Sequence, residues 1–188
     1  MKQQITKNAI ETAFIRLLKD RYFEKVMVKD IVEECGLTRN TFYYYYEDTY
    51  NIIADILERE IREIEQKIDE GCSLEQASVD VFEFLGENPK VAKHMFLSSK
   101  KDDIYQYIRS AVEIVLRYWI DKMTQGNPID ERDKKIILNM YKYGVQGLIE
   151  EWVQHGMKYS LQEEVERTQV LFMNSFEQVI HNCKNNKK

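Results

Sequence analysis

Residues that break secondary structure are rare along this chain, and their rarity limits the available folds more than any other feature. The 188 residues include only two prolines and seven glycines, the types that most often interrupt a helix or a strand. Most apolar residues recur three or four positions apart, the spacing that places them on one face of an α-helix. The sequence therefore predicts an all-α fold.

Helical spacing and turn residues together predict nine helices. Gly36 can adopt the left-handed conformation that ends a helix, and Pro89 suits the first turn of a new one. The clearest loop is Gln125–Pro128. The expected helices cover Thr6–Arg21, Val28–Cys35, a third helix capped by Thr38, Asp48–Gly71, Ser73–Gly86, Pro89–Ser98, Lys101–Met123, Asp130–Gly156 and Ser160–Asn182.

The composition is that of a globular protein, with 44% hydrophobic and 31% charged residues, which excludes disordered and collagen-like classes. Apolar runs are short, and Met1–Gln4 is polar where a signal peptide would become apolar. We therefore expect no membrane association. Cys35, Cys72 and Cys183 are widely separated and odd in number, which suits free thiols in a reducing cytoplasm.

Motifs for catalysis and metal binding are missing from the sequence. It contains no glycine-rich phosphate loop, nucleophile elbow or HExxH motif, each of which has a recognisable spacing. The histidines His94, His155 and His181 have no partner at metal-ligand spacing. We expect neither an enzyme nor a bound metal or cofactor.

Two short helices joined by a glycine turn, before and after Gly36, match the helix-turn-helix motif, whose second helix lies in the DNA major groove. On a helix that advances about 100° per residue, Phe42 and Tyr46 fall on the inward side, and Leu37 is expected in the core. A helix with many outward aromatic residues requires a partner. The outward side presents Asn40, Thr41, Tyr43 and Tyr44.

The outward side chains have the chemistry to bind DNA. The hydroxyls of Thr41, Tyr43 and Tyr45 can donate to phosphate oxygens, whereas Arg39 and Asn40 can reach the edges of guanine and adenine. The net charge of −5 is unfavourable for phosphate binding. However, residues 1–48 contain eight basic and eight acidic side chains, so the excess acidity belongs to residues 49–188.

Three segments closely resemble the TetR family of bacterial transcriptional regulators: Val28–Val32, Gly36–Thr38 and Thr41–Tyr46. The resemblance is detailed over about Thr6–Leu57 and depends on helix number and length beyond that. It implies a symmetric dimer with two three-helix heads in successive major grooves of a near-palindromic operator, commonly a repressor released by a small ligand. It also implies DNA contacts from Lys29, Thr38, Arg39, Asn40, Thr41, Tyr43, Tyr44 and Tyr45.

The resemblance gives an expected domain organisation. Residues 1–48 would form the helix-turn-helix head, residues 49–183 a larger helical ligand-binding and dimerisation domain, and residues 184–188 a disordered tail. Glycine inside a helix costs about 1 kcal/mol relative to alanine, and close approach of a second helix would offset that cost. The expected dimer interface, whose residues could equally be monomer core, comprises Gly144, Gly147, Leu148, Trp152, Phe172 and Phe176.

A small-molecule effector of unknown identity is a further expectation. Soft and aromatic side chains with a few hydroxyls line typical ligand cavities. Each of the candidate residues could instead be packed core, as apolar stripes on helices usually are. The candidate pocket residues are Met95, Phe96, Tyr105, Ile108, Val112, Trp119, Met140 and Tyr143.

Two positions depart from the family pattern. Met27 stands where a Thr or Ser usually caps the second helix, and Thr49 stands where a lysine is usual. The adjacent carboxylates of Glu47 and Asp48 would repel the DNA backbone, although Asp48 is a good N-cap. We therefore expect modest affinity or strong salt sensitivity. The alternative function, favoured by these charges, is a helical protein-interaction module that has lost DNA binding.

Overall fold

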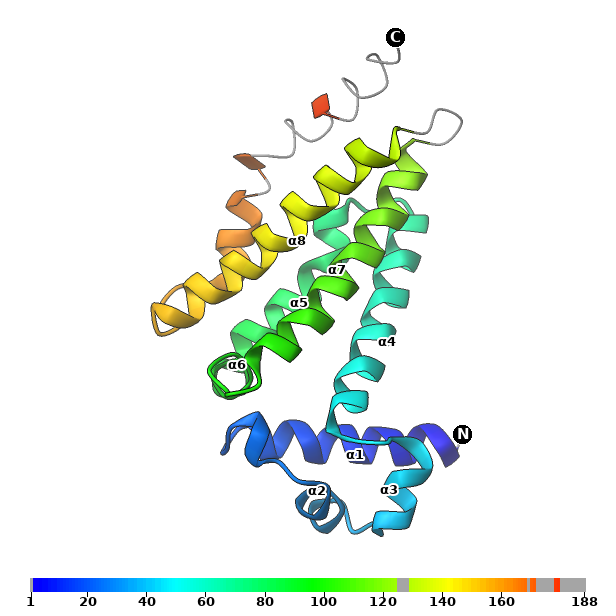
Figure 1. The fold of residues 1–188 in the computed structure, drawn as a ribbon, viewed down its shortest axis with the longest axis vertical. Coiled ribbons are helices and arrows are strands. Elements are labelled where there is room, and N and C mark those ends of the chain that lie inside the picture. Colours follow the sequence, from blue (N-terminus) through cyan, green and yellow to red (C-terminus); the bar gives the residue numbers. More distant parts are fainter. Residues whose placement is uncertain (1, 125–128, 169, 172–177, 180–188) are drawn as a thin grey trace. The chain divides into compact units, whose positions relative to one another are not determined.

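The computed structural model describes residues 2–124, 129–168, 170–171 and 178–179, and every regular element in these ranges is a helix (Figure 1). The predicted all-α fold is confirmed. Residues 161–168 are helical as well. The named helices are α1 (Lys2–Leu18), the 3₁₀ helix η1 (Phe23–Lys25), α2 (Val28–Glu34), α3 (Arg39–Tyr45), α4 (Thr49–Asp69), α5 (Leu74–Glu87), α6 (Pro89–Phe96), α7 (Lys101–Met123) and α8 (Glu131–Gln154).

The predicted helix positions are largely confirmed. Helix α7 has the expected bounds, and α2 to α6 and α8 agree to within two residues at most ends. Helix α1 differs most, because it begins at Lys2 and ends at Leu18 rather than Arg21. The short helix η1 was not predicted. The predicted helix Ser160–Asn182 is described only in part, and the predicted tail lies outside the described residues.

Contacts divide the chain into two compact units. Unit 1 combines Met1–Arg59 with Glu87–Tyr107, and unit 2 combines Glu60–Gly86 with Ile108–Lys188. Helix α6 belongs to unit 1 because it packs on α1, a contact between segments far apart in the sequence. The functional boundary between residues 48 and 49 stays a prediction.

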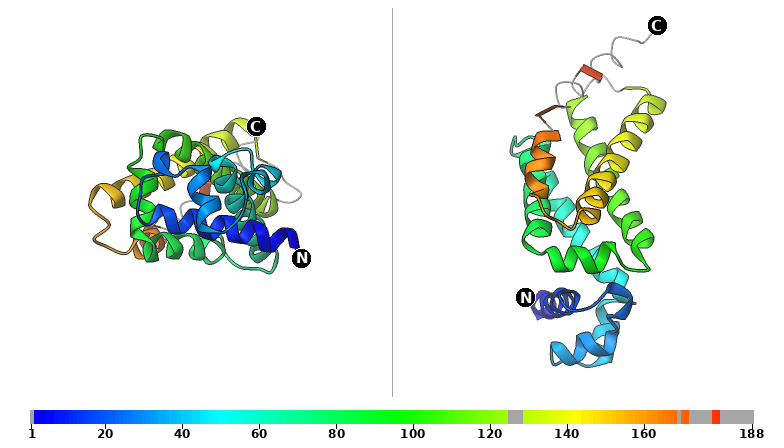
Figure 2. Two further views of the ribbon diagram at one scale, coloured as in Figure 1. Left: turned by 90° about the horizontal axis from the view of Figure 1, so that it is seen from below. Right: turned by 90° about the vertical axis from the view of Figure 1, so that its left-hand side faces the viewer.

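The core of unit 1 is built on the apolar stripe of α1. Ile10, Phe14 and Leu18 are buried on one face of that helix, as a spacing of four residues requires. The rings of Phe14 and Phe23 meet edge to face with centroids 6.2 Å apart. Helices α2 and α3 lie together on one side of α1 in two views at right angles (Figures 1 and 2). This three-helix arrangement leaves α3 at the surface.

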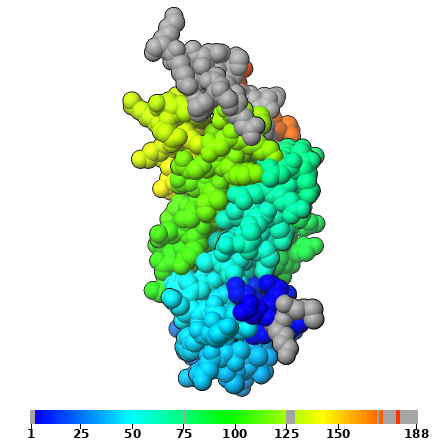
Figure 3. Space-filling view, turned by 90° about the vertical axis from the view of Figure 1, so that its right-hand side faces the viewer, coloured from blue at the N-terminus to red at the C-terminus, as the bar shows by residue number. Residues whose placement is uncertain are grey.

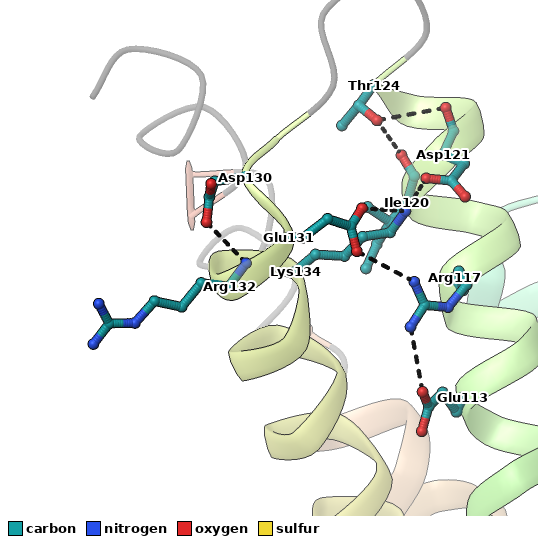
Figure 4. A network of polar contacts seen from close by, with 9 residues as sticks. All are labelled: Glu113, Arg117, Ile120, Asp121, Thr124, Asp130, Glu131, Arg132 and Lys134. Carbon is teal, nitrogen blue, oxygen red and sulfur yellow. Dashed lines mark hydrogen bonds and ion pairs between the residues drawn. The ribbon is translucent and has the colours of Figure 1, made fainter. Parts of the chain in front are cut away.

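Unit 2 has its own core and a ladder of charges between α7 and α8. Trp119, Ile120 and Leu138 are buried in the core. The ladder alternates in sign: Lys142 and Glu113 are 2.6 Å apart and Lys134 and Glu131 are 3.9 Å apart, nitrogen to oxygen. Figure 4 shows the ladder from Glu113 to Asp121. Each charge therefore has an oppositely charged neighbour. In order, the ladder is Lys142, Glu113, Arg117, Glu131, Lys134 and Asp121.

A groove of about 570 Å³ lies beside the ladder, where α4 and α7 meet on the surface shown in Figure 3. Glu65 of α4 and Ile114 and Tyr118 of α7 are among its lining residues. Among the described helices, none has the length and apolarity needed to cross a membrane.

Candidate nucleic-acid interface

The turn between α2 and α3 sets the direction of α3. Gly36 has a φ of +67°, the left-handed region that glycine adopts without steric cost. The Leu37 amide donates to the Val32 carbonyl at 2.9 Å, which satisfies a carbonyl at the end of α2. Leu37 itself is half-buried, so the expectation of a fully buried core residue was too strong: the turn keeps part of its side chain in solvent.

The predicted cap of α3 is confirmed. The Thr38 hydroxyl accepts a hydrogen bond from the Thr41 amide at 3.1 Å, and the two threonine hydroxyls lie 2.9 Å apart. Such a cap satisfies one of the free amides at a helix start. It also holds both hydroxyls at the same exposed corner of the helix.

Helix α3 has one buried side and one exposed side. Phe42 is fully buried and Tyr46 is 3% exposed, whereas Tyr43 is 57% and Tyr44 72% exposed. This division agrees with the predicted inward and outward residues. The eight predicted DNA contacts all reach the surface: Lys29, Thr38, Arg39, Asn40, Tyr43 and Tyr44 are exposed, and Thr41 and Tyr45 are half-buried.

The exposed aromatic rings of α3 are held by their neighbours. The rings of Tyr44 and Tyr45 meet edge to face with centroids 4.9 Å apart. The rings of Tyr43 and Phe42 meet in the same way with centroids 5.6 Å apart. Ring contacts of this kind limit the rotamers of side chains that would otherwise be free. The tyrosine surface is therefore partly ordered before any partner binds.

The start of α2 is capped in spite of Met27. The Met27 side chain makes no capping hydrogen bond and is 50% exposed. Instead, the Asp30 carboxylate accepts from the Met27 amide at 3.2 Å, and Arg21 pairs with the same carboxylate at 3.3 Å. This supplies half of a capping box. The departure at position 27 therefore removes a hydroxyl from the surface and leaves one helix cap in place.

Basic side chains on the surface of the first 48 residues fall into two groups. Arg16 pairs with Glu34 at 2.7 Å, and Arg21 pairs with Asp30. Lys29 and Arg39 make no ion pair with any described residue, so their charges are available to an anionic partner such as phosphate.

The start of α4 carries the predicted cap. The Asn51 amide donates to Asp48 Oδ1 at 3.0 Å, and Asn51 Oδ1 accepts from the Glu47 amide at 2.9 Å. Reciprocal bonds of this type satisfy several free amides at a helix start. Glu47 and Asp48 remain exposed, so both carboxylates contribute negative charge at the surface that follows α3.

A partly buried polar cluster in unit 1 joins α1, the end of α3 and α4. The Tyr46 hydroxyl donates to Asp55 at 2.8 Å, and Lys7 donates to the same carboxylate at 2.8 Å. Arg59 donates to Glu11 at 2.7 Å. Burial and the hydrogen bond to Asp55 raise the pKa of Tyr46 well above its usual value, so this phenol stays protonated.

Sequence reasoning missed the roles of Lys7, Glu11, Asp55 and Arg59. These partners are 35 to 48 residues apart across the contacts Tyr46–Glu11, Lys7–Asp55 and Arg59–Glu11, and helical periodicity carries no information at that separation. The only local signal was the inward position of Tyr46, because a buried hydroxyl requires a hydrogen-bond partner.

The predicted ligand-pocket residues are divided between the two units. Phe96 and Tyr105 are buried in unit 1, where their rings stack at 5.2 Å. Trp119 belongs to the core of unit 2, whereas Met140 is 71% exposed on α8. The remaining four are Met95, Ile108 and Val112, which are half-buried, and Tyr143, which is exposed. The described residues contain no group of three or more side chains suited to a metal.

The predicted dimer-interface residues also differ in exposure. Gly144 and Gly147 are exposed, with open space where a side chain would lie, and Leu148 is half-buried. Trp152 is 1% exposed and donates its indole hydrogen to the Tyr159 carbonyl at 2.8 Å, so its ring is enclosed by its own chain and has almost no surface for a second one. The predicted residues Phe172 and Phe176 lie outside the described residues.

Sequence comparison identifies related transcription regulators. A family model described as the C-terminal region of transcriptional regulators matches residues 73–174, more than half of the chain. A Bacillus subtilis (strain 168) protein, the uncharacterized HTH-type transcriptional regulator YxbF, is 39% identical over 49 residues. That match covers 26% of this chain and 13% of YxbF.

Solved structures share the fold over nearly the whole chain. The dihydroxyacetone kinase operon activator DhaS superposes with a TM-score of 0.64 at 18% identity, covering 96% of this chain and 97% of DhaS. A TetR transcriptional regulator from Streptococcus agalactiae 2603V gives 0.58 at 19% identity, covering 89% and 93%. The Thermus thermophilus repressor FadR, solved with lauroyl-CoA, gives 0.54 at 15% identity with the same coverage. At these identities the comparison shows a common fold.

Proposed function

Because this chain belongs to the TetR family of transcriptional regulators, we propose that it binds a near-palindromic operator as a homodimer and acts as a ligand-responsive repressor. Double-stranded DNA in the cytoplasm is its proposed partner, and no catalytic role is proposed. The family membership supports a DNA-binding regulator; the operator, the dimer and the effector belong to the proposal.

The exposed side of α3 is the observation that carries the DNA-binding proposal. Arg39 and Asn40 lie exposed at the start of the helix, where they can read base edges, and Tyr43 and Tyr44 offer hydroxyls and rings beyond them. The buried side, formed by Phe42 and Tyr46, fixes the helix to the rest of unit 1. A rigid helix with a polar, aromatic outer face suits the major groove.

The homodimer proposal is supported by an apolar stripe on α8. Ile136 is 51% exposed, Met140 71% and Tyr143 58%, and helical spacing places them on one face with the exposed glycines at 144 and 147. Large apolar side chains gathered on one surface mark interaction sites in many proteins. Two copies joined symmetrically through this stripe would present two heads, as a palindromic operator requires.

Two parts of the proposal, that the chain represses transcription and that it responds to a small-molecule effector, are based on family resemblance. Among proteins of this fold, DhaS is named as an activator and FadR as a repressor, so a reporter assay has to establish the direction for this chain. Under the proposal, a small ligand shifts the dimer to a state whose head separation no longer matches half-sites about 34–36 Å apart. Structures with and without effector that show the same head spacing would contradict this mechanism.

Binding to promoter DNA tests the proposed function. Purified protein would be titrated against its own upstream promoter fragments at several salt concentrations, beside an Arg39→Ala, Tyr43→Ala double variant. We expect specific binding that weakens steeply with salt, because phosphate contacts release counterions, and we expect the variant to lose it. Both substitutions are on exposed side chains, so the variant should stay folded.

The second candidate function is a protein-interaction module. The exposed carboxylates of Glu47 and Asp48 beside α3 favour it, because they repel phosphate. Absence of specific binding to every promoter fragment at every salt concentration would support this candidate over the regulator.

A further inference from the structure

Unit 1 includes residues 87–107, although in the sequence these residues lie between two segments of unit 2. Helix α6 and the first turns of α7 pack with α1 and the start of α4. Val91, Ala92 and Phe96 of α6 are each at most 2% exposed, and Ile104 of α7 is fully buried. Residues 87–107 therefore share a hydrophobic core with α1 and the start of α4.

One polar contact joins α6 to the end of α1. His94 Nδ1 lies 2.7 Å from the carbonyl oxygen of Leu18, the last residue of α1. A carbonyl can only accept, so Nδ1 carries the hydrogen and the ring donates. Carbonyls in the last turn of a helix lack partners within the helix. His94 thus caps α1 from 76 residues away, and its ring meets Tyr22 edge to face at 4.8 Å.

A second set of contacts joins α7 to the start of α4. The Tyr50 hydroxyl donates to Asp103 Oδ2 at 3.0 Å, and the rings of Tyr50 and Tyr107 stack with centroids 6.1 Å apart. The Phe23 ring also contacts the Tyr50 ring edge to face, with centroids 4.9 Å apart. Burial and the Asp103 hydrogen bond raise the pKa of Tyr50 to about 12, so the hydroxyl keeps its hydrogen at neutral pH.

These contacts hold both helices that flank the helix-turn-helix. The end of α1 leads through η1 into α2, and only Tyr46, Glu47 and Asp48 separate α3 from α4. A shift of the end of α1 or the start of α4 is therefore passed to α2 and α3 within a few residues.

We propose that α6 and Lys101–Tyr107 form a brace for the DNA-binding head, with His94, Tyr50 and Asp103 as positioning residues that set the arrangement of α2 and α3. The brace touches no predicted DNA contact. It acts by keeping the head in its binding-competent arrangement, since apparent affinity falls in proportion to the competent fraction. The inference depends on the proposed function only for its DNA-binding readout.

Paired substitutions in the full-length protein test the brace. His94→Phe keeps a ring against Tyr22 and removes the donor, whereas His94→Asn keeps an N–H donor near the position of Nδ1. His155→Phe is the matched control, because His155 follows the last residue of α8 and its Nδ1 lies 2.9 Å from the Glu151 carbonyl, on an exposed surface of unit 2. Tyr50→Phe removes the second polar contact and keeps the ring stack.

Hydrogen exchange and DNA affinity are measured for each variant. We expect His94→Phe to speed amide exchange in residues 17–21 and to weaken binding to the tightest promoter fragment, each by about two- to tenfold, the range of one hydrogen bond. His94→Asn should restore most of both, Tyr50→Phe should weaken DNA binding similarly, and His155→Phe should change neither.

Unchanged amide exchange in His94→Phe would overturn the brace. Faster exchange in residues 17–21 together with wild-type DNA affinity would also overturn it, because His94 would then only stabilise the end of α1. Exchange is measured without DNA. Exchange in His94→Phe that is faster in α2 and α3 as well as in residues 17–21, and that is restored in His94→Asn, would support the brace even if no promoter fragment bound, so failure of the brace and failure of the proposed function are distinguishable.

Discussion

Tyr44 and Phe42 lie two positions apart on α3, and we expect them to have different roles. Tyr44 should contact DNA, whereas Phe42 should stabilise the fold. Tyr44 is 72% exposed and Phe42 is fully buried. We expect Tyr44→Ala to weaken operator binding by about tenfold, the loss of one or two contacts. The free energy of unfolding should change by no more than about 0.5 kcal/mol, as for most surface substitutions. Fluorescence anisotropy with operator DNA and urea unfolding measure the two quantities.

Phe42→Ala is the matched control for Tyr44→Ala. It removes a buried ring from the unit 1 core and should lower the free energy of unfolding by about 3–5 kcal/mol. Wild-type operator affinity in Tyr44→Ala would remove Tyr44 from the interface, and a stability loss as large as that of Phe42→Ala would contradict the exposed position of its ring.

Asp55 makes stability depend on pH. Burial alone would raise the pKa of Asp55, but hydrogen bonds from Lys7 and Tyr46 and the charges of Lys7 and Arg59 hold it below its ordinary 3.8. The unfolded chain therefore binds this proton more tightly. The resulting stabilisation is fully present well above pH 3.8 and is lost as pH falls through the lower, folded pKa.

Asp55→Asn should lower the free energy of unfolding by about 2 kcal/mol near neutral pH, since Lys7 would lose its charged, partly buried partner. The difference from wild type should shrink as the pH falls below 3.8, where Asp55 of the wild type also becomes neutral. Urea unfolding at several pH values measures both. A difference that stays constant down to strongly acidic pH would show that the Asp55 charge contributes nothing.

At the scale of elements, the turn between α2 and α3 depends on the backbone of Gly36. Its φ of +67° strains any residue with a side chain, although no atom lies within 4 Å of the position a Cβ would take. We expect Gly36→Ala to lower the free energy of unfolding by about 1 kcal/mol. The measurement is the urea midpoint, and the loss should come from backbone strain alone because the site has space.

Gly86→Ala is the control for Gly36→Ala. Gly86 lies within α5 in open space and has no positive φ, so alanine should stabilise the chain by about 0.5–1 kcal/mol. If both substitutions changed stability in the same direction, the positive φ of Gly36 would not be the cause of the effect.

At the scale of the whole molecule, the apolar stripe on α8 is the surface through which we propose that two copies join. Met140 lies within the stripe and is 71% exposed. We expect Met140→Glu to convert the dimer to a folded monomer, because two symmetry-related glutamates would be buried at one interface without partners. Sedimentation velocity measures the mass and circular dichroism the helix content. Operator affinity should fall as well, since one head contacts one half-site.

Ile114→Glu controls for the introduced charge. Ile114 is 49% exposed on α7 and lies outside the stripe, so this variant should remain a dimer. A dimeric Met140→Glu, or two monomeric variants, would show that the stripe on α8 is not the interface.

Much of the fold follows from local spacing. Helix positions, the Thr38 and Asp48 caps, the Gly36 turn and the two sides of α3 depend on residues within about four positions of one another, and short-range hydrogen bonds and helical periodicity determine them. The TetR resemblance follows from the same short segments. These features were therefore predictable from the sequence alone, apart from the bounds of α1 and the short helix η1.

Contacts between distant segments were not predictable, because they depend on how the helices pack. The bond from His94 to the Leu18 carbonyl and the Tyr46–Asp55–Lys7 cluster are examples. Periodicity shows that a helix has an apolar face and cannot show what covers it. Trp119 and Met140 were equally plausible pocket residues by spacing, yet packing buries the first in a core and leaves the second at the surface.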